Sequence, residues 1–183
     1  PGVEWSTGNL GQGLSAGVGM ALAAKLTNKN YKVYVFSSDG ESAKGQIAEA
    51  RRTARKENLN NLIVLLDYND IQISGRARDI LYVNIAAEYR AAGWNVIEID
   101  GHDLKQINDA LESAENQKIG PSVIVAKTII GKGVSFMENT PSYHGKALSL
   151  EELDKALKEL GLENDVHKYI EKRKQLSLKR EEN

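Results

Sequence analysis

Short apolar runs alternate with longer helix-forming segments along most of the chain. Four runs have the length and apolar content of buried strands, at residues 33–36, 62–66, 95–99 and 122–126. Runs that stay largely apolar instead of alternating with polar residues are typical of strands that are covered on both faces. The pattern therefore predicts the interior strands of a parallel sheet.

Helix-forming segments separate these runs. The segments expected to be helical are residues 11–26, 46–58, 85–92, 104–116 and 150–160. Gly93 can end the third helix and Asp103 can cap the fourth. Gly13, Gly17 and Gly19 would let the first helix pack closely against its neighbours. Strands that alternate with helices of this length predict an α/β fold, a mainly parallel sheet with helices on both faces.

The chain has 183 residues, of which 41% are hydrophobic, enough for one substantial core. We expect one domain over residues 1–160. The remaining residues, 161–183, are strongly charged and predict a helical C-terminal extension outside that core.

Charge and cysteine content exclude several classes of function. Lys and Arg number 24 against 25 Asp and Glu, so no general attraction to nucleic acid or an anionic membrane is expected. The absence of cysteine excludes disulfides and thiolate chemistry. The longest stretch of small apolar residues, 14–26, is too short to span a bilayer, and no signal peptide is visible. These features predict a soluble, cytoplasmic protein.

Candidate metal ligands follow two of the predicted strands. Asp39 comes after the first strand and Asn69 after the second, and ligands of open α/β sheets bind beyond such strand ends. Carboxylate and amide oxygens suit Mg²⁺, and Gly40 would let the backbone approach a phosphate. On these residues alone, ordinary turn chemistry explains the pattern better than metal binding.

The wider pattern resembles the transketolase family. Asp39-Gly40 followed by Asn69 is similar to the thiamine diphosphate signature, a Gly-Asp-Gly followed by an Asn after a comparable spacer. The other segments in transketolase order are residues 6–15, 101–103, 127–133, 134–139 and 144–146. The resemblance extends to about residue 160. The glycine-rich segment, residues 6–15, is similar to transketolases and not to thiamine enzymes in general.

The resemblance implies a thiamine diphosphate-binding fold and a site for Mg²⁺. Asp39 and Asn69 would bind Mg²⁺ through their side chains, and Ile71 through its carbonyl oxygen. Gly40 would approach the diphosphate, and Asn69 would contact the cofactor as well as the metal.

Three further residues are implied at the organic part of the cofactor. Gly8 and Leu10 would meet the aminopyrimidine or thiazolium ring through backbone groups. His144 would reach the cofactor or the substrate carbonyl and exchange a proton there, which makes it the candidate catalytic residue.

The implied reaction transfers a two-carbon ketol unit between sugar phosphates, with thiamine diphosphate and Mg²⁺ as cofactors. In the family, a pyrimidine-binding domain supplies an activating glutamate across an oligomer interface. That domain and the C-terminal domain are not among these residues, so a companion chain is implied and the isolated chain is expected to be inactive. Family sequence upstream of the glycine-rich segment is also missing, which makes this an N-terminally truncated diphosphate-binding domain. Either the chain is part of a split N-terminal subunit, or the sequence starts late.

Two residues depart from the family pattern. Ser38 stands where the signature has its first Gly. Lys44 stands where the family has a Glu in an acidic network between cofactor sites, and Glu41 would offset that change in part if this loop turns helically. These departures keep open a non-catalytic transketolase-like binding or assembly module, and a subunit of another thiamine diphosphate enzyme remains a weaker alternative.

A diphosphate-binding domain without its partner is expected to expose an apolar or small-residue face. The helices over residues 10–24 and 46–54 are the expected contributors, because their Gly and Ala residues permit close approach. Packing inside the chain's own fold is the alternative explanation for those small residues.

Overall fold

The computed structural model describes residues 2–162 and 171–172. The chain forms two compact units, Pro1–Thr128 and Ile129–Asn183, and each is described by itself below. The predicted charged extension over residues 161–183 lies outside the described residues, apart from 161, 162, 171 and 172. None of the helices within the described ranges is long and apolar enough to cross a membrane.

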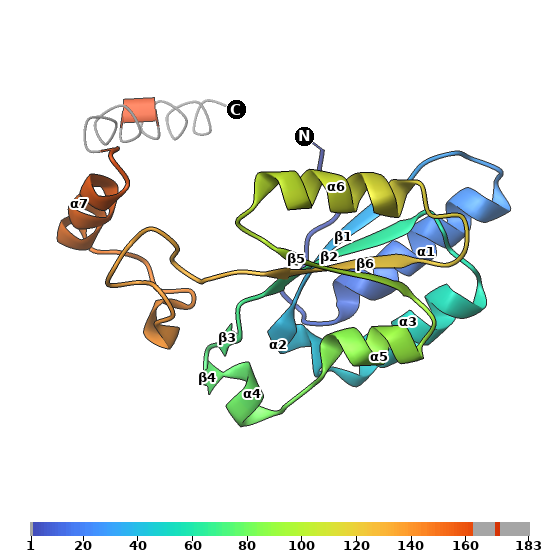
Figure 1. Ribbon diagram of the computed structural model, residues 1–183, viewed down its shortest axis with the longest axis horizontal. Helices are drawn as coiled ribbons and strands as arrows, with labels where there is room; N and C mark the ends of the chain where they lie inside the picture. The colour runs from blue at the N-terminus through green and yellow to red at the C-terminus, as the bar shows by residue number, and fades with distance from the viewer. Residues whose placement is uncertain (1, 163–170, 173–183) are drawn as a thin grey trace, which may run out of the picture. The chain divides into compact units, whose positions relative to one another are not determined.

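The first unit is built on a four-stranded parallel sheet (Figure 1). Its strand order is β1 (Val33–Ser38), β2 (Leu62–Tyr68), β6 (Ser122–Lys127) and β5 (Asn95–Asp100). The predicted parallel sheet is confirmed, and each strand runs one or two residues further than expected. The extra residues are the polar strand ends, where the backbone pairing continues although the apolar pattern has stopped.

Helices cover both faces of this sheet, as predicted. Figure 1 shows α1 (Gln12–Leu26), α3 (Gly45–Lys56) and α5 (Ile85–Ala91) on one face and α6 (Leu104–Glu115) on the other. Two apolar clusters fill the layers between helices and sheet. Successive side chains of β2 point to opposite faces of the sheet, and both faces are buried, which explains the uninterrupted apolar run. Val64 packs in the larger cluster, while Ile63 packs in the cluster under α6.

The predicted helix boundaries are confirmed where the sequence offered a cap. The Asp103 carboxylate accepts hydrogen bonds from the backbone N–H groups of Lys105 (2.9 Å) and Gln106 (3.2 Å) at the start of α6. Gly93 follows α5 with φ of 80°, a left-handed conformation that glycine adopts without strain.

In the first unit, four short elements carry no periodic signal and were not predicted. They are α2 (Asp39–Ser42), β3 (Ile71–Gln72), β4 (Gly75–Arg76) and α4 (Ala77–Ile80). β3 and β4 form a small antiparallel hairpin that follows β2. All four follow β1 or β2 along the chain, so the unpredicted structure of this unit belongs to the candidate site.

The second unit contains an irregular loop, a short 3-10 helix η1 (Pro141–Tyr143) and α7 (Leu150–Glu159). α7 starts with a capping box in which the Ser149 hydroxyl accepts from the Glu152 N–H (3.1 Å) and Glu152 accepts from the Ser149 N–H (2.8 Å). At the other end of α7, the Glu159 carboxylate accepts from both the backbone N–H and the hydroxyl of Ser135.

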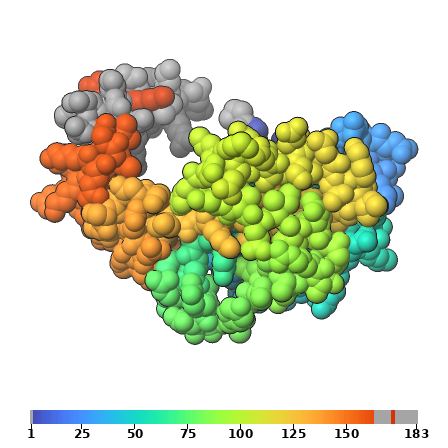
Figure 2. Space-filling view, viewed as in Figure 1, coloured from blue at the N-terminus to red at the C-terminus, as the bar shows by residue number. Residues whose placement is uncertain are grey.

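Exposed large apolar side chains lie on α1 and also outside it. α1 buries Leu14, Val18, Ala21 and Ala24 in its own fold and exposes Met20 and Leu26. Two further groups are Val3, Trp5 and Leu10, before α1, and Ile73, Ile80, Leu81 and Tyr82, around the β3–β4 hairpin and α4; other exposed side chains, such as Phe36, Leu104 and Leu150, lie outside these groups. In Figure 2 the segment that carries α4, coloured green, lies at the surface. Gly19, Met20 and Ala23 of α1 are also exposed, so the expected face on α1 and α3 stays a prediction and these two patches add to it.

The close packing of α1 depends on one of its three glycines. A Cβ added at Gly17 would lie 2.3 Å from the Val35 Cγ2 atom, whereas nothing lies within 4 Å of a Cβ at Gly19. We expect Gly17→Ala to lower the free energy of unfolding by about 1–3 kcal/mol through overpacking. Gly19→Ala, the matched control, should instead raise it by up to about 1 kcal/mol, because alanine favours the helix. Urea denaturation of both variants measures this, and a Gly17→Ala protein as stable as wild type would contradict it.

Candidate functional site

Two loops meet at the carboxyl ends of β1 and β2. Asp39 directly follows β1, and its Oδ2 atom accepts a hydrogen bond from the backbone N–H of Asp70 (2.5 Å), in the loop after β2. Its Oδ1 atom accepts from the N–H of Gly40 (2.7 Å). The parallel register pairs Ser38 with Asp67, so both loops leave the sheet at the same level. Asp39 is thereby fixed against the loop that carries Asn69.

The Asn69 side chain is oriented by its own loop. Its amide Nδ2 donates to Asp67 Oδ2 (2.9 Å), and its Oδ1 accepts from the N–H of Ile71 (2.9 Å). Ile71 opens β3 with its side chain buried. The structure thus brings Asp39, Asn69 and Ile71 to one edge of the sheet. Their roles as Mg²⁺ ligands stay predictions.

The Asp39 carboxylate is buried, with 5% of the residue exposed. Burial raises the pKa of Asp39, the Asp67 and Asp70 carboxylates raise it further, and the two backbone N–H groups lower it in part. Within residues 2–162, no ion pair joins Asp39 to a Lys, Arg or His. A buried acid without a positive partner fits a cation.

The donor set is suited to a magnesium ion that shares its shell with a phosphate. In the part of the chain that the structure describes, no three His, Asp or Glu side chains gather into a metal-binding group. The predicted ligands are instead one carboxylate, one amide oxygen and one carbonyl oxygen. Mg²⁺ sites of this kind are completed by water and phosphate oxygens, so the residues present fit Mg²⁺ with a diphosphate.

Asp70 anchors the hairpin after β2, and no pattern in the sequence indicated this. Its Oδ2 atom accepts from Arg78 Nε (2.5 Å) and Arg76 Nη1 (3.3 Å), and its Oδ1 atom accepts from the Arg78 N–H (3.1 Å). Asp70 holds a φ of 63°, which few residue types other than Gly, Asn and Asp adopt readily. Burial acts to raise its pKa, but the bonds from Arg78 and Arg76 outweigh it and lower the pKa of Asp70. The carboxylate therefore stays charged and holds β4 and α4 against the Asn69 loop.

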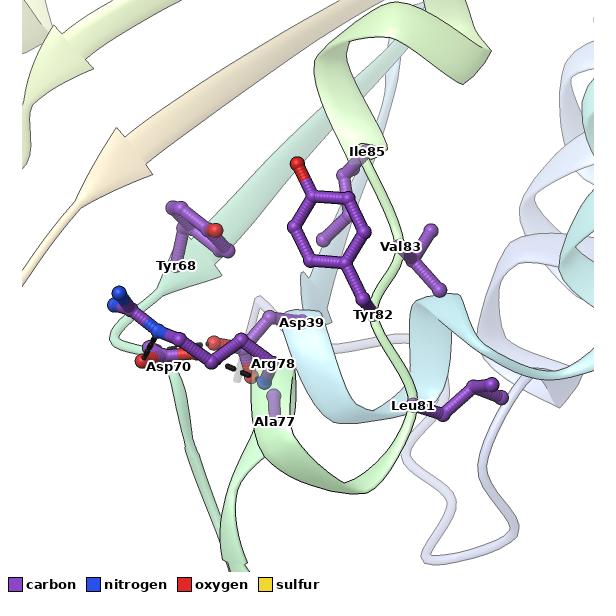
Figure 3. A pocket seen from close by; sticks show the side chains of 9 residues that line it. All are labelled: Asp39, Tyr68, Asp70, Ala77, Arg78, Leu81, Tyr82, Val83 and Ile85. Carbon is purple, nitrogen blue, oxygen red and sulfur yellow. Dashed lines mark hydrogen bonds and ion pairs between the residues drawn. The ribbon is translucent and has the colours of Figure 1, made fainter.

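A small pocket opens beside this anchor (Figure 3). Asp39 and Asp70 lie at one side, the Arg78 side chain extends toward Asp70, and Leu81 and Tyr82 lie on the irregular segment that leads to α5. The buried acid thus faces a cavity at the strand ends.

The glycine-rich segment lies against the same loops. Gly8 and Leu10 are both exposed residues. Gly11, at the start of α1, has a φ of 92°, and its N–H donates to Glu41 Oε2 (2.8 Å). Gly40 is approached by the hairpin: a Cβ there would meet Gln72 Oε1 at 3.3 Å. The cofactor roles of Gly8, Leu10, Gly40 and Asn69 stay predictions.

His144 lies in the second unit, directly after η1, with an exposed side chain. Its loop is held from both sides by Glu152, which accepts from the Tyr143 hydroxyl (2.9 Å) and from Lys146 Nζ (2.7 Å). The pKa of Glu152 is lowered to about 2, chiefly by the hydrogen bond from Lys146. The hydrogen bonds from the Ser149 N–H and the Tyr143 hydroxyl lower it further. The loop is thereby held by a carboxylate that stays charged at neutral pH, and the catalytic role of His144 stays a prediction.

The two departures from the family pattern have different local settings. The Ser38 hydroxyl caps α2 by accepting from the Glu41 N–H (3.4 Å), so serine has a structural use at this strand end. Lys44 is exposed at the position before α3, and its side chain makes no capping hydrogen bond there.

Comparison with known proteins agrees with this geometry. The family model described as transketolase, thiamine diphosphate binding domain, matches residues 1–182. The chain is 37% identical over 161 residues to a subunit of the apulose-4-phosphate transketolase of Phocaeicola vulgatus, and the match covers 87% of this chain and 57% of that protein. It is 41% identical over 160 residues to 6-deoxy-6-sulfo-D-fructose transketolase subunit SqwG of Clostridium sp. (strain MSTE9), covering 87% of this chain and 58% of that protein.

A solved structure shows the same fold. The transketolase of Campylobacter jejuni superposes with a TM-score of 0.84 at 35% identity, covering 90% of this chain and 27% of that one. The predicted α/β fold of thiamine diphosphate-binding type is confirmed by this match. The chain spans a little over half the length of the subunits it matches, and about a quarter of the solved transketolase.

Asp70 should stabilise the chain in a pH-dependent way. Asp70→Asn keeps a residue type that tolerates the positive φ but removes the charge that Arg78 and Arg76 bind. Near neutral pH we expect it to lower the free energy of unfolding by about 1–2 kcal/mol, the low end for bonds to charged groups, because both arginines are half exposed. The folded-state pKa of Asp70 is lowered, so the stabilisation is lost as pH falls through that pKa, and the gap between variant and wild type should close in acid.

Urea denaturation at neutral and acidic pH measures this difference. Asp79→Asn, at an exposed position of the same helix α4, is the control and should leave stability within about 0.5 kcal/mol of wild type at both pH values. A gap between Asp70→Asn and wild type that does not change with pH would contradict the expectation.

Proposed function

The chain belongs to the transketolase family, within its N-terminal, thiamine diphosphate-binding domain, and from this we propose that it is the diphosphate-binding component of a transketolase-type enzyme. It holds Mg²⁺ and the diphosphate of thiamine diphosphate, and works with a companion chain in two-carbon ketol transfer between sugar phosphates. The observation that carries the proposal is the Asp39 carboxylate, which is buried beside the Asn69 loop without an ion pair to any described residue.

The chain's own residues hold and orient the cofactor in this proposal. Thiamine diphosphate, when bound, supplies the nucleophilic carbon of the reaction. Asp39, Asn69 and the Ile71 carbonyl would bind Mg²⁺, and the backbone of Gly40 would approach the diphosphate. The backbone of Gly8 and Leu10 contacts the organic part of the cofactor.

His144 is the proposed proton donor and acceptor of the reaction. Its imidazole gives or takes a proton at the substrate carbonyl oxygen, which is work that histidine performs near neutral pH. The Glu152 carboxylate, bonded to Tyr143 and Lys146, keeps this loop in place.

A companion chain is supported by two independent observations. The relatives from Phocaeicola vulgatus and Clostridium are both named as subunits of their transketolases. Exposed apolar side chains at residues 3–10 and 73–82 flank the segments proposed to bind the cofactor. Interfaces bury such side chains, so these two patches are the proposed contact surface for the pyrimidine-binding domain.

A non-catalytic binding or assembly module is the second candidate, and Lys44 is the residue that favours it. A base where the family has an acid inverts the local charge. Cofactor binding without transfer activity in the presence of a companion chain would favour this candidate.

The cofactor assignment predicts a ligand-dependent gain in stability. Thiamine diphosphate with Mg²⁺, each at about 100 times its dissociation constant, should stabilise the chain by about 2.7 kcal/mol, and omission of Mg²⁺ should remove most of that gain. Asp39→Ala should abolish the response, because it removes the only carboxylate proposed to bind the metal. Asp109→Ala, on α6 at the surface, is the control and should respond like wild type. Thermal denaturation with and without ligand measures this, and an Asp39→Ala protein that responds fully would overturn the metal assignment.

The companion chain predicts a split activity. The isolated chain, given thiamine diphosphate, Mg²⁺, a ketose phosphate donor and an aldose acceptor, should show no ketol transfer, because the activating glutamate lies outside it. Addition of a chain that carries the pyrimidine-binding domain should produce transfer that saturates at a fixed ratio of the two chains. Transfer by the isolated chain, followed by product analysis, would refute the divided site.

A further inference from the structure

One side chain connects the two loops of the candidate site. Glu41 is the third residue of α2, the short helix that starts at Asp39. Its Oε1 atom accepts from the Ser37 hydroxyl (2.6 Å) and the Ser38 N–H (3.1 Å), at the end of β1. Its Oε2 atom accepts from the N–H of Gly11 (2.8 Å), thirty residues earlier in the chain. The two oxygens of one carboxylate therefore hold two different segments.

Gly11 is a sensitive place for such a bond. It is buried, takes a left-handed φ of 92°, and stands at the start of α1, where no side chain of its own caps the helix. The Glu41 carboxylate accepts the N–H of this N-cap residue, as the N3 side chain of a capping box does, and places negative charge at a helix N-terminus, which the helix dipole favours. The bond therefore fixes where the glycine-rich segment ends and α1 begins.

We propose that Glu41 is a positioning residue for thiamine diphosphate: its carboxylate sets the distance between the Gly8–Leu10 backbone and the Asp39-Gly40 loop without touching the cofactor. The proposal rests on the function proposed above, in which these two segments hold different parts of one ligand. A ligand held at two points binds best when both points are already at the right separation. Glu41 keeps them there in the cofactor-free chain.

The geometry demands a full-length carboxylate. In Glu41→Gln one oxygen remains; if it stays with Ser37 and Ser38, the amide NH₂ faces the Gly11 N–H, donor against donor. In Glu41→Asp the charge remains but the side chain is one methylene shorter, so it cannot span from α2 to both segments. Both variants should break the Gly11 bond, for different reasons.

The first measurement needs no cofactor. Hydrogen–deuterium exchange of the Gly11 amide in the free chain should be about tenfold faster or more in Glu41→Gln and Glu41→Asp than in wild type, because the bonded N–H becomes free. Glu159→Gln is the matched control: that carboxylate also accepts from a backbone N–H and a serine hydroxyl, both of Ser135. It should leave exchange at Gly11 unchanged.

The second measurement is the affinity for thiamine diphosphate with Mg²⁺, by titration calorimetry. We expect binding about tenfold weaker in both Glu41 variants and unchanged in Glu159→Gln. Should Glu41→Gln fail to fold, Glu41→Asp alone decides, because it keeps a carboxylate at this position. Unchanged Gly11 exchange, or faster exchange with wild-type affinity, overturns the proposal. A wild-type chain that binds no cofactor would instead defeat the proposed function, while the exchange measurement still shows whether Glu41 holds Gly11.

Discussion

Parallel pairing of β1 with β2 is the constraint on which the candidate site depends. Because the two strands run in the same direction and pair Ser38 with Asp67, both chains leave the sheet at one edge. Asp39 then reaches the backbone of the Asn69 loop over a single hydrogen bond. A shift of one residue in this register would turn the strand-end side chains to the other face and separate the predicted ligands. The apolar clusters on both faces fix the register, so the core packing also fixes the site.

The site places carboxyl groups close together where the fold alone would avoid them. Asp39 is buried among the carboxylates of Asp67 and Asp70, and its raised pKa records that cost. Asp70 offsets its own charge through Arg76 and Arg78, whereas the donors to Asp39 from the described residues are backbone N–H groups. Unfavourable groups that persist in a well-packed fold tend to lie at functional sites. The contrast between two neighbouring aspartates explains why only one of them is a candidate metal ligand.

The strands and the helices that cover them could be predicted from the sequence, but the side-chain contacts that complete the site could not. Apolar runs predict strands because burial on both faces selects such residues, and the same logic places Asp39 and Asn69 at strand ends. The β3–β4 hairpin has no such signal, since its anchor is a pairing of Asp70 with two arginines. The bridge from Glu41 to Gly11 spans thirty residues and depends on tertiary placement. The role of the small residues in α1 could not be read from the sequence for the same reason. Gly17 packs against Val35 inside the fold and does not contribute to an outer surface.

Ser38 and Lys44, the two departures from the family pattern, differ in their contacts: Ser38 makes hydrogen bonds within this chain, whereas the Lys44 side chain is exposed. Ser38 is used within this chain, since its hydroxyl caps α2, and the main chain after it still delivers Asp39 to the strand end. Lys44 makes no comparable contribution: its side chain is exposed, and its Cβ lies 3.4 Å from where a Cβ on Gly11 would stand. An exposed base at this position costs the free chain little, because water solvates its charge. Any consequence of Lys44 must therefore arise from a surface that covers it, and the charge of that surface decides whether a base at this position is tolerated or selected.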